Sequence, residues 1–396
     1  MIINVQRGDS LWKYSQLFEL PLQLLIDSNS QIDAKALQIG QVVQIPGYRL
    51  QVYTVMPGDS LWAIEQRFGI KHNQLLYMNP GVSVYGLQIG QKLLLPIAVT
   101  SIVVNVNRPY TYSALNEDIA VLLEIYPFLK LEQAATSVMG KEIMALTIGN
   151  GARRVHMNGA IHANEWITAP VLVRFLNEYA LAVTTGENIR GLDMRPFYAL
   201  TQLLVIPIVN PDGVDLVIQG PPNEEPYRSN VLQINEGSES FSGWKANIRG
   251  VDLNKQFPAL WERDAVQGPQ QPAPRDYSGT APLTEPEVQG LAEITRRMNF
   301  DHVLAFHTQG KVIYWGFEQL EPPRSEAMAN EFARVSGYSA VQYVNSTAGY
   351  KDWFIQTWRR PGFTIELGEG TNPLPLSQLE EIYDAALGIM LAALYE

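Results

Sequence analysis

The hydrophobic positions of the first hundred residues are spaced for short helices set between short strands. Ser10 can N-cap a helix, because its side chain can accept a hydrogen bond from a backbone N–H of the first turn. The apolar residues that follow it at helical spacing are Leu11, Tyr14, Leu17 and Phe18. A second short helix is predicted over residues 21–27, and β-prone residues precede the first helix at positions 4–5.

From about residue 111 onward, apolar runs alternate with amphipathic stretches. Strands are predicted over residues 154–157, 203–209, 302–306, 312–314 and 362–365. Helices are predicted over residues 167–183, 285–298, 325–336 and 377–394. This alternation is typical of an α/β fold in which helices cover both faces of one sheet. Functional sites in such folds tend to lie in the loops at the carboxyl ends of the strands.

The pattern of the first part occurs twice, with an offset of 50 residues. The string GDSLW starts at Gly8 and again at Gly58, and LQIGQ starts at positions 37 and 87. Between these strings, Asn29 is matched by Asn79. Each copy is predicted to fold as strand, helix, helix, strand, over residues 1–47 and 51–97. A larger domain is predicted over residues 111–396.

The repeated strings resemble the lysin motif (LysM) family, through the GDSLW start, the central asparagine and the IGQ-x-(L/V)-x-(I/L)-P ending. The resemblance implies two small βααβ modules that bind glycans containing N-acetylglucosamine, such as peptidoglycan or chitin. For the individual residues Trp12 and Trp62, the alternative is that they only hold the small fold together. For the modules as wholes, we expect glycan binding.

Composition narrows the chemistry that the chain can perform. Its 396 residues include 29 basic and 40 acidic side chains, and the net charge of −11 argues against nucleic acid and anionic membranes as partners. No cysteine is present, which excludes disulfides, iron–sulfur clusters and thiolate zinc sites. A metal ion would therefore be held by His, Asp and Glu. The histidines are His72, His156, His162, His302 and His307.

Two further patterns bear on location. No apolar run approaches the roughly 20 residues that span a bilayer, so we expect no membrane insertion. The start MIINVQRGDS has no basic region followed by an apolar stretch, so we expect no signal peptide. A cytoplasmic or spore-associated protein that acts on cell-wall material fits this expectation, as does a protein released from the cell on lysis.

One histidine has an acidic neighbour at a spacing typical of metal ligands. Glu165 follows His162 by three residues, between an expected strand through residues 158–161 and a helix that opens at Glu165. A lone H-x-x-E is a weak signal, but a strand-to-helix loop allows two side chains to face one ion. His307, at the end of another predicted strand, offers a third ligand. Two ligands from one loop and one distant ligand are a normal arrangement for catalytic zinc.

A series of strings in this region resembles the zinc carboxypeptidase family. In chain order they are GAIHANEW at 159–166, NPDG at 210–213, GVDLN at 250–254, YSG at 277–279, TEPE at 284–287, AFH at 305–307 and FTIEL at 363–367. The resemblance implies a carboxypeptidase-like mixed β-sheet flanked by helices. It also implies one Zn²⁺ held by His162, Glu165 and His307, with Glu366 as the general base. This fits the chemistry, because zinc lowers the pKa of water to roughly 7 and a carboxylate can carry its proton to a leaving amine.

A cation is also needed to stabilise the oxyanion that forms during attack on an amide. In the family, an arginine that directly follows a tryptophan in sequence has this role, and the matching string here reads GWKAN. Lys245 is therefore the candidate, with a single ammonium in place of a bidentate guanidinium. The alternative is an ordinary solvated lysine.

Two further arginines of the family pattern are absent. Family carboxypeptidases grip the terminal carboxylate with an Asn-Arg pair and an arginine in the zinc loop, whereas this chain has Asn254-Lys255 and Asn164. Bidentate recognition of a terminal carboxylate is therefore not expected, although Asn254 and Lys255 can still bind an acid. Lys351 stands at the base of the family's side-chain pocket and would favour an acidic substrate group. The alternative is an ion pair between Lys351 and a carboxylate such as Asp352.

The mobile tyrosine of the family has no clear counterpart. The aligned position is near Val344, and Tyr343 and Tyr350 are the substitutes that the sequence offers. The sequence leaves this role open.

The whole layout resembles bacterial γ-D-glutamyl-L-diamino acid endopeptidases, through HANEWIT, GWKAN, PRDYSG and YKDWF as well as the two modules. This resemblance implies hydrolysis of the γ-D-glutamyl–L-diamino acid bond of murein stem peptides, with the modules raising the effective concentration of enzyme at the wall. Candidates for binding the substrate are Asn254, Lys255, Lys351, Arg249, Arg359 and Tyr350.

Two alternatives remain from the sequence. One is an ordinary zinc carboxypeptidase that acts on muropeptides or peptides. The other is a glycan-binding protein with an inactive peptidase domain. The complete set of His162, Glu165, His307 and Glu366 argues against the second alternative, because a decayed site usually loses one of its members.

Overall fold

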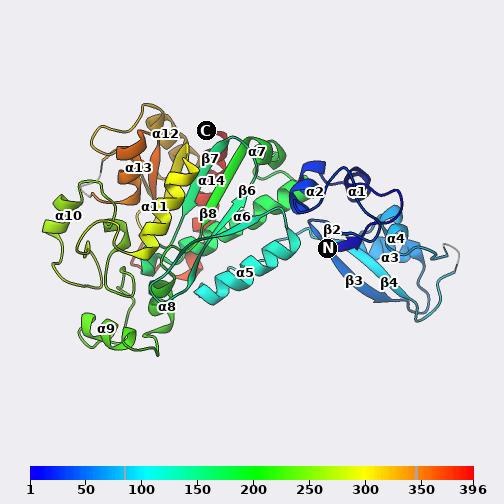
Figure 1. The fold of residues 1–396 in the computed structure, drawn as a ribbon, viewed down its shortest axis with the longest axis horizontal. Coiled ribbons are helices and arrows are strands. Elements are labelled where there is room, and N and C mark those ends of the chain that lie inside the picture. The colour runs from blue at the N-terminus through cyan, green and yellow to red at the C-terminus, as the bar shows by residue number, and fades with distance from the viewer. Residues whose placement is uncertain (84–85, 344–346) are drawn as a thin grey trace. The chain divides into compact units, whose positions relative to one another are not determined.

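The computed structural model describes residues 1–83, 86–343 and 347–396. Its internal contacts divide the chain into two compact units. One unit consists of Met1–Val103, Ile119–Lys130 and Asn177–Arg195, and the other of Val104–Asp118, Leu131–Leu176 and Pro196–Glu396. Figure 1 shows the helices and strands along the chain. The finer division into residues 1–47, 51–97 and 111–396 stays a prediction.

Each copy of the repeat folds as two strands around two helices. The elements are β1 (Ile2–Asn4), α1 (Leu11–Phe18), α2 (Leu22–Ser28) and β2 (Val42–Gln44), then β3 (Tyr48–Thr54), α3 (Leu61–Phe68), α4 (His72–Met78) and β4 (Lys92–Ala98). β1 and β2 pair antiparallel, and so do β3 and β4. Ser10 and Ser60 cap α1 and α3, each accepting a hydrogen bond from a backbone N–H three residues on. The predicted N-caps and the βααβ order are therefore confirmed.

The matched asparagines, Asn29 and Asn79, make equivalent hydrogen bonds in the two copies. Asn29 donates from Nδ2 to the carbonyls of Leu25 and Gln44, each at 2.8 Å, and accepts from the N–H of Gln44. Asn79 makes the equivalent bonds to Leu75 and Leu94 in the second copy. Both asparagines are buried, so each satisfies backbone groups that water cannot reach. The repeated asparagine thus links a helix to a strand by the same hydrogen bonds in both modules.

The two modules also contact each other within their unit. The Tyr77 hydroxyl of the second module donates to Asp9 Oδ2 of the first at 2.7 Å, and its ring lies edge-on to Tyr14. Gln74 Nε2 donates to the carbonyl of Leu17 at 2.9 Å. These contacts join α4 to α1, so the modules form a pair.

The larger region is built on one eight-stranded sheet. Its strands, from edge to edge, are β11 (Ser339–Val341), β10 (Val312–Tyr314), β12 (Gly362–Leu367), β9 (His302–Thr308), β7 (Arg153–Asn158), β8 (Thr201–Ile206), β6 (Glu142–Ile148) and β5 (Lys130–Thr136). The four central strands β12, β9, β7 and β8 are parallel, whereas β10 and β6 run antiparallel to their central neighbours. The sheet is mixed, as the sequence predicted.

The helices of this region, with their bounds, are as follows: α5 (Tyr112–Ile125), α6 (Thr168–Thr185), α7 (Met194–Leu200), α8 (Pro211–Gln219), α9 (Tyr227–Ile234), α10 (Trp261–Gln267), α11 (Pro286–Met298), α12 (Arg324–Ser336), α13 (Tyr350–Trp358) and α14 (Leu379–Tyr395). Short 3₁₀ turns are formed by Ala163–Glu165, Leu253–Lys255 and Leu376–Gln378. The sequence predicted α6, α11, α12 and α14, but not the shorter helices, α5, β5 or β6.

Helices cover both faces of the sheet. On one face, Val288 and Leu291 of α11 belong to the same apolar cluster as Val303 and Ala305 of β9. Side chains alternate along a strand, so the buried Leu304 and its neighbours at even positions face the opposite layer. Figure 1 shows α11 in front of the strands and α14 behind them. The sheet is therefore a rigid, buried platform for the residues at its strand ends.

Candidate metal centre and active site

The central parallel strands bring four of the predicted residues to one end of the sheet. His307 and Glu366 are direct neighbours in the register between β9 and β12. β7 lies on the other side of β9, and its last residue, Asn158, pairs with Ala305. The loop that leaves β7 carries His162 and Glu165. The site therefore lies at the carboxyl ends of parallel strands, where α/β folds place ligands.

The zinc loop differs from the prediction in its local structure. The strand was expected to reach Ile161, but β7 ends at Asn158 and the chain turns at Ala160, whose φ is 47°. The helix was expected to open at Glu165, but a 3₁₀ turn over Ala163–Glu165 comes first and α6 begins at Thr168. The physical reason is the buried Thr168 hydroxyl. It accepts from the N–H of Ala160 and donates to the carbonyl of Glu165, both at 2.8 Å, which closes the loop.

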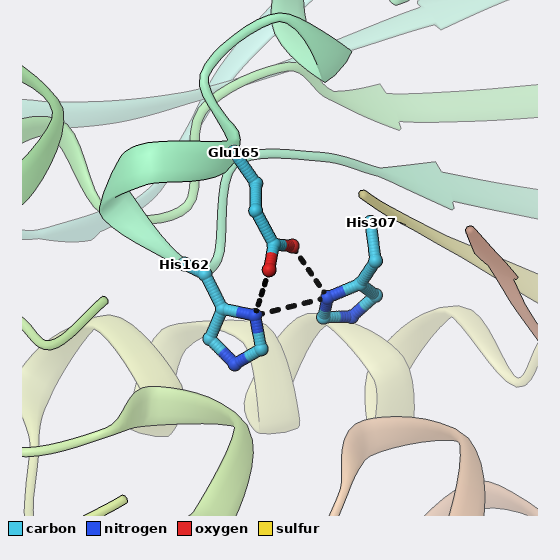
Figure 2. Close-up of side chains that lie close together, drawn as sticks. All are labelled: His162, Glu165 and His307. Carbon is cyan, nitrogen blue, oxygen red and sulfur yellow. Dashed lines mark hydrogen bonds and ion pairs between the residues drawn. The ribbon is translucent and has the colours of Figure 1, made fainter. Parts of the chain in front are cut away.

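Two side chains of this loop, His162 and Glu165, converge with His307 of β9, as Figure 2 shows. His162 Nδ1 lies 2.8 Å from Glu165 Oε1, and His307 Nδ1 lies 2.9 Å from Glu165 Oε2. The two Nδ1 atoms are 3.1 Å apart. All three side chains are buried, and their potential ligand atoms lie within 4.8 Å of one another. Neutral imidazole nitrogens and a carboxylate are the donor set that zinc prefers, so the residues present fit a zinc ion.

The charges at this cluster are strongly coupled. Burial alone would raise the pKa of Glu165, but the adjacent His162 and His307 hold it well below its usual range. Burial would lower the pKa of His162, but the Glu165 and Asp252 carboxylates together outweigh burial and raise that pKa to about 9. The pKa of His307 is lowered, mainly by burial. The carboxylate is therefore ionised and faces two nitrogens, which is the state that a cation requires.

Sequence reasoning missed one residue of this centre, Asp252. Its Oδ1 lies 3.2 Å from His162 Nε2, on the far side of the ring from the cluster. It is fully buried and accepts further hydrogen bonds from the N–H groups of Asn254 and Asp276. A carboxylate at Nε2 keeps the proton on that nitrogen and leaves Nδ1 for a metal. The string GVDLN contained Asp252, but its spacing from His162 gave no sign of the contact.

Glu366 and Lys245 lie in the electrostatic field of the cluster. Burial and the nearby Glu165 raise the pKa of Glu366 to about 8, and the cations of His162 and Lys245 act in the opposite direction. Burial lowers the pKa of Lys245, but Asp252 and Glu165 outweigh it, so the net shift is upward. Lys245 is therefore positively charged, and its half-buried side chain interacts electrostatically with Asp252 and Glu165.

Three basic candidates for substrate binding, Lys255, Arg249 and Lys351, interact with nearby carboxylates or carbonyls. Lys255 Nζ lies 2.6 Å from Asp264 Oδ2, and its neighbour Asn254 accepts a hydrogen bond from the N–H of Tyr350 through Oδ1. Arg249 Nη1 lies 3.3 Å from Glu285 Oε2. The charges of Lys255 and Arg249 are therefore already balanced in this structure.

Two candidates at the start of α13, Tyr350 and Lys351, have buried side chains. Tyr350 is fully buried, and its hydroxyl is bonded to Thr295 in the core, so it offers no surface to a substrate. Lys351 is also buried; it donates to the carbonyl of Gly316 and pairs with Asp352. The alternative of an ion pair is thus the one that the structure displays.

The remaining candidates from the sequence are Arg359, Tyr343 and Val344. Arg359 is exposed at the end of α13. The Tyr343 hydroxyl donates to Glu321 at 2.8 Å, and Val344 lies outside the described residues. The role of the family's mobile tyrosine therefore stays open.

The mixed sheet and the His–Glu–His cluster define a metallopeptidase of the carboxypeptidase type. The family model described as zinc carboxypeptidase matches residues 115–387, and the LysM domain model matches residues 3–46 and 53–96. The chain belongs to the zinc carboxypeptidase family and carries two LysM domains in front of the peptidase domain. It is a zinc metallopeptidase, with zinc as its cofactor.

Its relatives narrow the class further. The chain is 59% identical, over the full length of both sequences, to gamma-D-glutamyl-L-diamino acid endopeptidase 1 of Lysinibacillus sphaericus. It is 41% identical to the uncharacterized protein YqgT of Bacillus subtilis, over 72% of this chain and 77% of that protein.

Solved structures share the fold at low sequence identity. Bovine thrombin-activatable fibrinolysis inhibitor, in complex with tick carboxypeptidase inhibitor, matches with a TM-score of 0.59 and 18% identity, over 73% of this chain and 97% of that chain. Carboxypeptidase A from Helicoverpa armigera matches with a TM-score of 0.54 and 18% identity, over 74% and 75% of the two chains. Among the described residues, no helix has the length and apolar character needed to cross a membrane.

Proposed function

We propose that this protein hydrolyses the γ-D-glutamyl–L-diamino acid bond of murein stem peptides. The observation that carries the proposal is the 59% identity to an endopeptidase with this name, which extends over both LysM domains and the peptidase domain without a gap in coverage. The four residues expected of a working centre, His162, Glu165, His307 and Glu366, are all present. This completeness favours an active enzyme over a glycan-binding protein with a decayed peptidase domain.

The residues proposed to hold zinc are His162 and His307, each through Nδ1, and Glu165. When bound, zinc polarises the scissile carbonyl and lowers the pKa of a water molecule to roughly 7. Asp252 accepts a hydrogen bond from Nε2–H of His162 and thereby keeps Nδ1 available as a ligand. The ionised Glu165 supplies one negative charge to balance the cation.

Glu366 is proposed to act as the general base and then as the general acid. Its carboxylate would remove the proton of the attacking water and deliver it to the nitrogen of the leaving diamino acid. A half-buried carboxylate whose pKa is raised toward neutrality suits both steps, because it must gain and lose a proton in each turnover. Lys245, positively charged beside Asp252 and Glu165, is proposed to stabilise the negative charge that develops on the carbonyl oxygen.

The missing arginines support an endopeptidase rather than a carboxypeptidase. A carboxypeptidase must recognise a free terminal carboxylate, for which a guanidinium fork is well suited. Here Lys255 stands in place of one arginine, and Asp264 at 2.6 Å already balances its charge. The neutral Asn164 stands in place of the other. Without a strong clamp, the site does not require the substrate to end just after the scissile bond.

The LysM domains are proposed to hold the enzyme on peptidoglycan through its N-acetylglucosamine units. Trp12 and Trp62 occupy equivalent positions in α1 and α3, and their side chains are 64% and 69% exposed. A large exposed aromatic ring on each module is suited to stacking on a sugar face. Anchoring two modules to the glycan would raise the local concentration of stem peptides at the peptidase domain.

The proposal is tested with synthetic stem peptides and mass spectrometry of the fragments. The substrates are L-Ala-γ-D-Glu linked to meso-diaminopimelate or to L-lysine, and the matched control is the isomer with an α-linked D-Glu. We expect L-Ala-γ-D-Glu to be released from at least one γ-linked peptide, and the α-linked isomer to stay intact. A chelator should stop the cleavage.

Two outcomes would replace the proposal with one of its alternatives. Faster hydrolysis of hippuryl dipeptides than of any γ-linked peptide would show an ordinary carboxypeptidase. Zinc binding without turnover of any stem peptide would show a glycan-binding protein with an inactive peptidase domain.

A further inference from the structure

Two glutamates at the start of α11 converge on the side-chain amide of Asn247. Asn247 Nδ2 donates to Glu285 Oε2 at 2.8 Å and lies 3.5 Å from Glu287 Oε2. Asn247 and Glu287 are fully buried and Glu285 nearly so. These glutamates form the TEPE string, one of the sequence landmarks, yet neither contacts the zinc centre. Their common partner points to the function of this string.

The other end of the amide closes a tight turn. Asn247 Oδ1 accepts from the N–H groups of Arg249 at 3.0 Å and Val251 at 3.1 Å. The Asn247 backbone N–H donates to the carbonyl of Val251 at 2.8 Å, and its carbonyl accepts from the N–H of Gly250 at 3.0 Å. The orientation of the amide is therefore determined: its NH₂ must face the carboxylates and its oxygen must face the backbone N–H groups.

This turn connects two groups of the active site. Lys245 lies two residues before Asn247, and its carbonyl accepts from the N–H of Ala163, the residue after His162. Asp252 directly follows Val251 and contacts His162 Nε2 at 3.2 Å. A shift of the turn would therefore move the proposed oxyanion cation and the carboxylate that orients a metal ligand. The contacts of Glu285 and Glu287 tie the turn to the rigid helix α11.

We infer that Asn247, held by Glu285 and Glu287, is a positioning residue that fixes Asp252 and Lys245 relative to His162. Asn247 affects the metal and the reaction through Asp252 and Lys245, and it contacts neither the metal nor the substrate itself. An aspartate has the same size but cannot donate, and it would set a third carboxylate against two others. The inference rests on the proposed function only for the reaction that is assayed, because zinc affinity reports on it independently.

The test compares Asn247→Asp with the wild-type full chain. We expect the zinc dissociation constant, from chelator competition, to rise by up to about 10-fold, the lower end of the loss seen when the direct hydrogen-bond partner of a metal ligand is removed, because Asn247 acts through Asp252. The value of kcat on the γ-linked peptide should fall, with a smaller change in KM. The matched control is Asn299→Asp, an exposed residue at the opposite end of α11, which should leave all three values unchanged.

A second substitution separates positioning from general stability. In the double variant Asn247→Asp, Glu285→Gln, the amide and the carboxylate exchange positions, so that the new amide at position 285 can donate to the new carboxylate at position 247. We expect the double variant to recover most of the lost zinc affinity and kcat. If Asn247→Asp does not fold, Glu285→Ala, which removes only the 2.8 Å acceptor, should show a smaller loss of zinc affinity in the same direction.

Several results would overturn the inference. One is a folded Asn247→Asp variant with a lower melting temperature but wild-type zinc affinity and kcat. Another is a double variant that recovers neither value, and a third is a Glu285→Ala variant with wild-type zinc affinity. If the wild-type chain cleaves no γ-linked peptide, the proposed function fails, while the series of zinc affinities still decides on Asn247.

Discussion

At the scale of single residues, Glu366 has a position and an environment that suit a proton carrier. It stands beside His307 in the register of β9 and β12, and burial together with Glu165 raises its pKa to about 8. Glu366→Gln keeps the size of the side chain but removes proton transfer. We therefore expect kcat on the γ-linked peptide to fall about 10²–10⁴-fold, with zinc content unchanged.

The matched control for this prediction is Glu369→Gln. Glu369 lies three residues further on, is exposed and faces Lys311 at 3.5 Å, so its loss should leave kcat unchanged. Activity is measured by product release and zinc content by elemental analysis. A Glu366→Gln variant with wild-type kcat would remove the assignment of the general base.

The sequence indicated which residues take part in the metal centre better than it indicated where the neighbouring side chains point. The spacing of His162 and Glu165 and the strand end at His307 indicated three possible ligands, and the resemblance to zinc carboxypeptidases assigned them to one zinc ion. The inward direction of Tyr350 and Lys351 was not predictable, because sequence shows their type but not which face of α13 meets the core. Asp252 was missed because its contact with His162 joins residues far apart in the chain and depends on the packing of two loops.

At the scale of elements, two parallel strands carry buried histidines that the zinc centre does not use. Burial lowers the pKa of His156 in β7 to about 3, and that of His302 in β9 to about 4, from the ordinary 6.5. The folded chain therefore binds fewer protons than the unfolded chain between pH 6.5 and about 4. Stability contributed by the neutral imidazoles is present above pH 6.5 and is lost as the pH falls.

We therefore expect the contribution of His156 and His302 to the stability of the zinc-free protein to fall as the pH is lowered from about 6.5 to about 5, whereas Glu287 and Glu366, whose pKa values are raised to about 7 and about 8, contribute in the opposite direction. Each of the two histidines should contribute up to about 1.4 kcal/mol per pH unit to the free energy of unfolding of the peptidase domain. His302→Gln retains a donor for the carbonyl of Ala393, to which His302 Nε2 lies at 2.8 Å. Relative to the wild type, the free energy of unfolding of this variant should fall less, or rise more, as the pH is lowered from about 6.5 to about 5. An identical slope, measured by denaturant unfolding at several pH values, would contradict this account.

Burial sets the pattern of some of the elements that the sequence predicted, although the largely buried β6 was missed. β9 is buried at every position, and α14 has a continuous apolar side, so both were recognised. β5 was not, because most of its residues are exposed or half-buried and alternate weakly. The turn of the zinc loop at Ala160 was also missed. It depends on the hydroxyl of Thr168, a contact that hydrophobic spacing does not record.

At the scale of the whole molecule, the LysM pair and the peptidase domain are proposed to have separate tasks. Replacing Trp12 and Trp62 together by alanine in the full chain should weaken binding to insoluble peptidoglycan. Hydrolysis of a short soluble stem peptide should keep its kcat and KM, because such a substrate has no glycan to hold. The matched control is Val266→Ala, a similarly exposed apolar residue of α10.

Sedimentation with purified cell walls measures the first effect and fragment release measures the second. Unchanged sedimentation of the double variant would show that the two indoles only belong to the surface of the small fold. Glycan binding by the modules would then have to use other side chains.

The central claim is that one zinc ion, held by His162, Glu165 and His307, makes this chain a peptidase for the γ-D-glutamyl bond. The most direct measurement is a zinc titration of the chelated protein, with release of L-Ala-γ-D-Glu from the γ-linked peptide as the readout. We expect cleavage to be absent without zinc and to reach its plateau at about one zinc per chain. Full cleavage by the zinc-free protein, or none by the zinc-loaded protein, would contradict the claim.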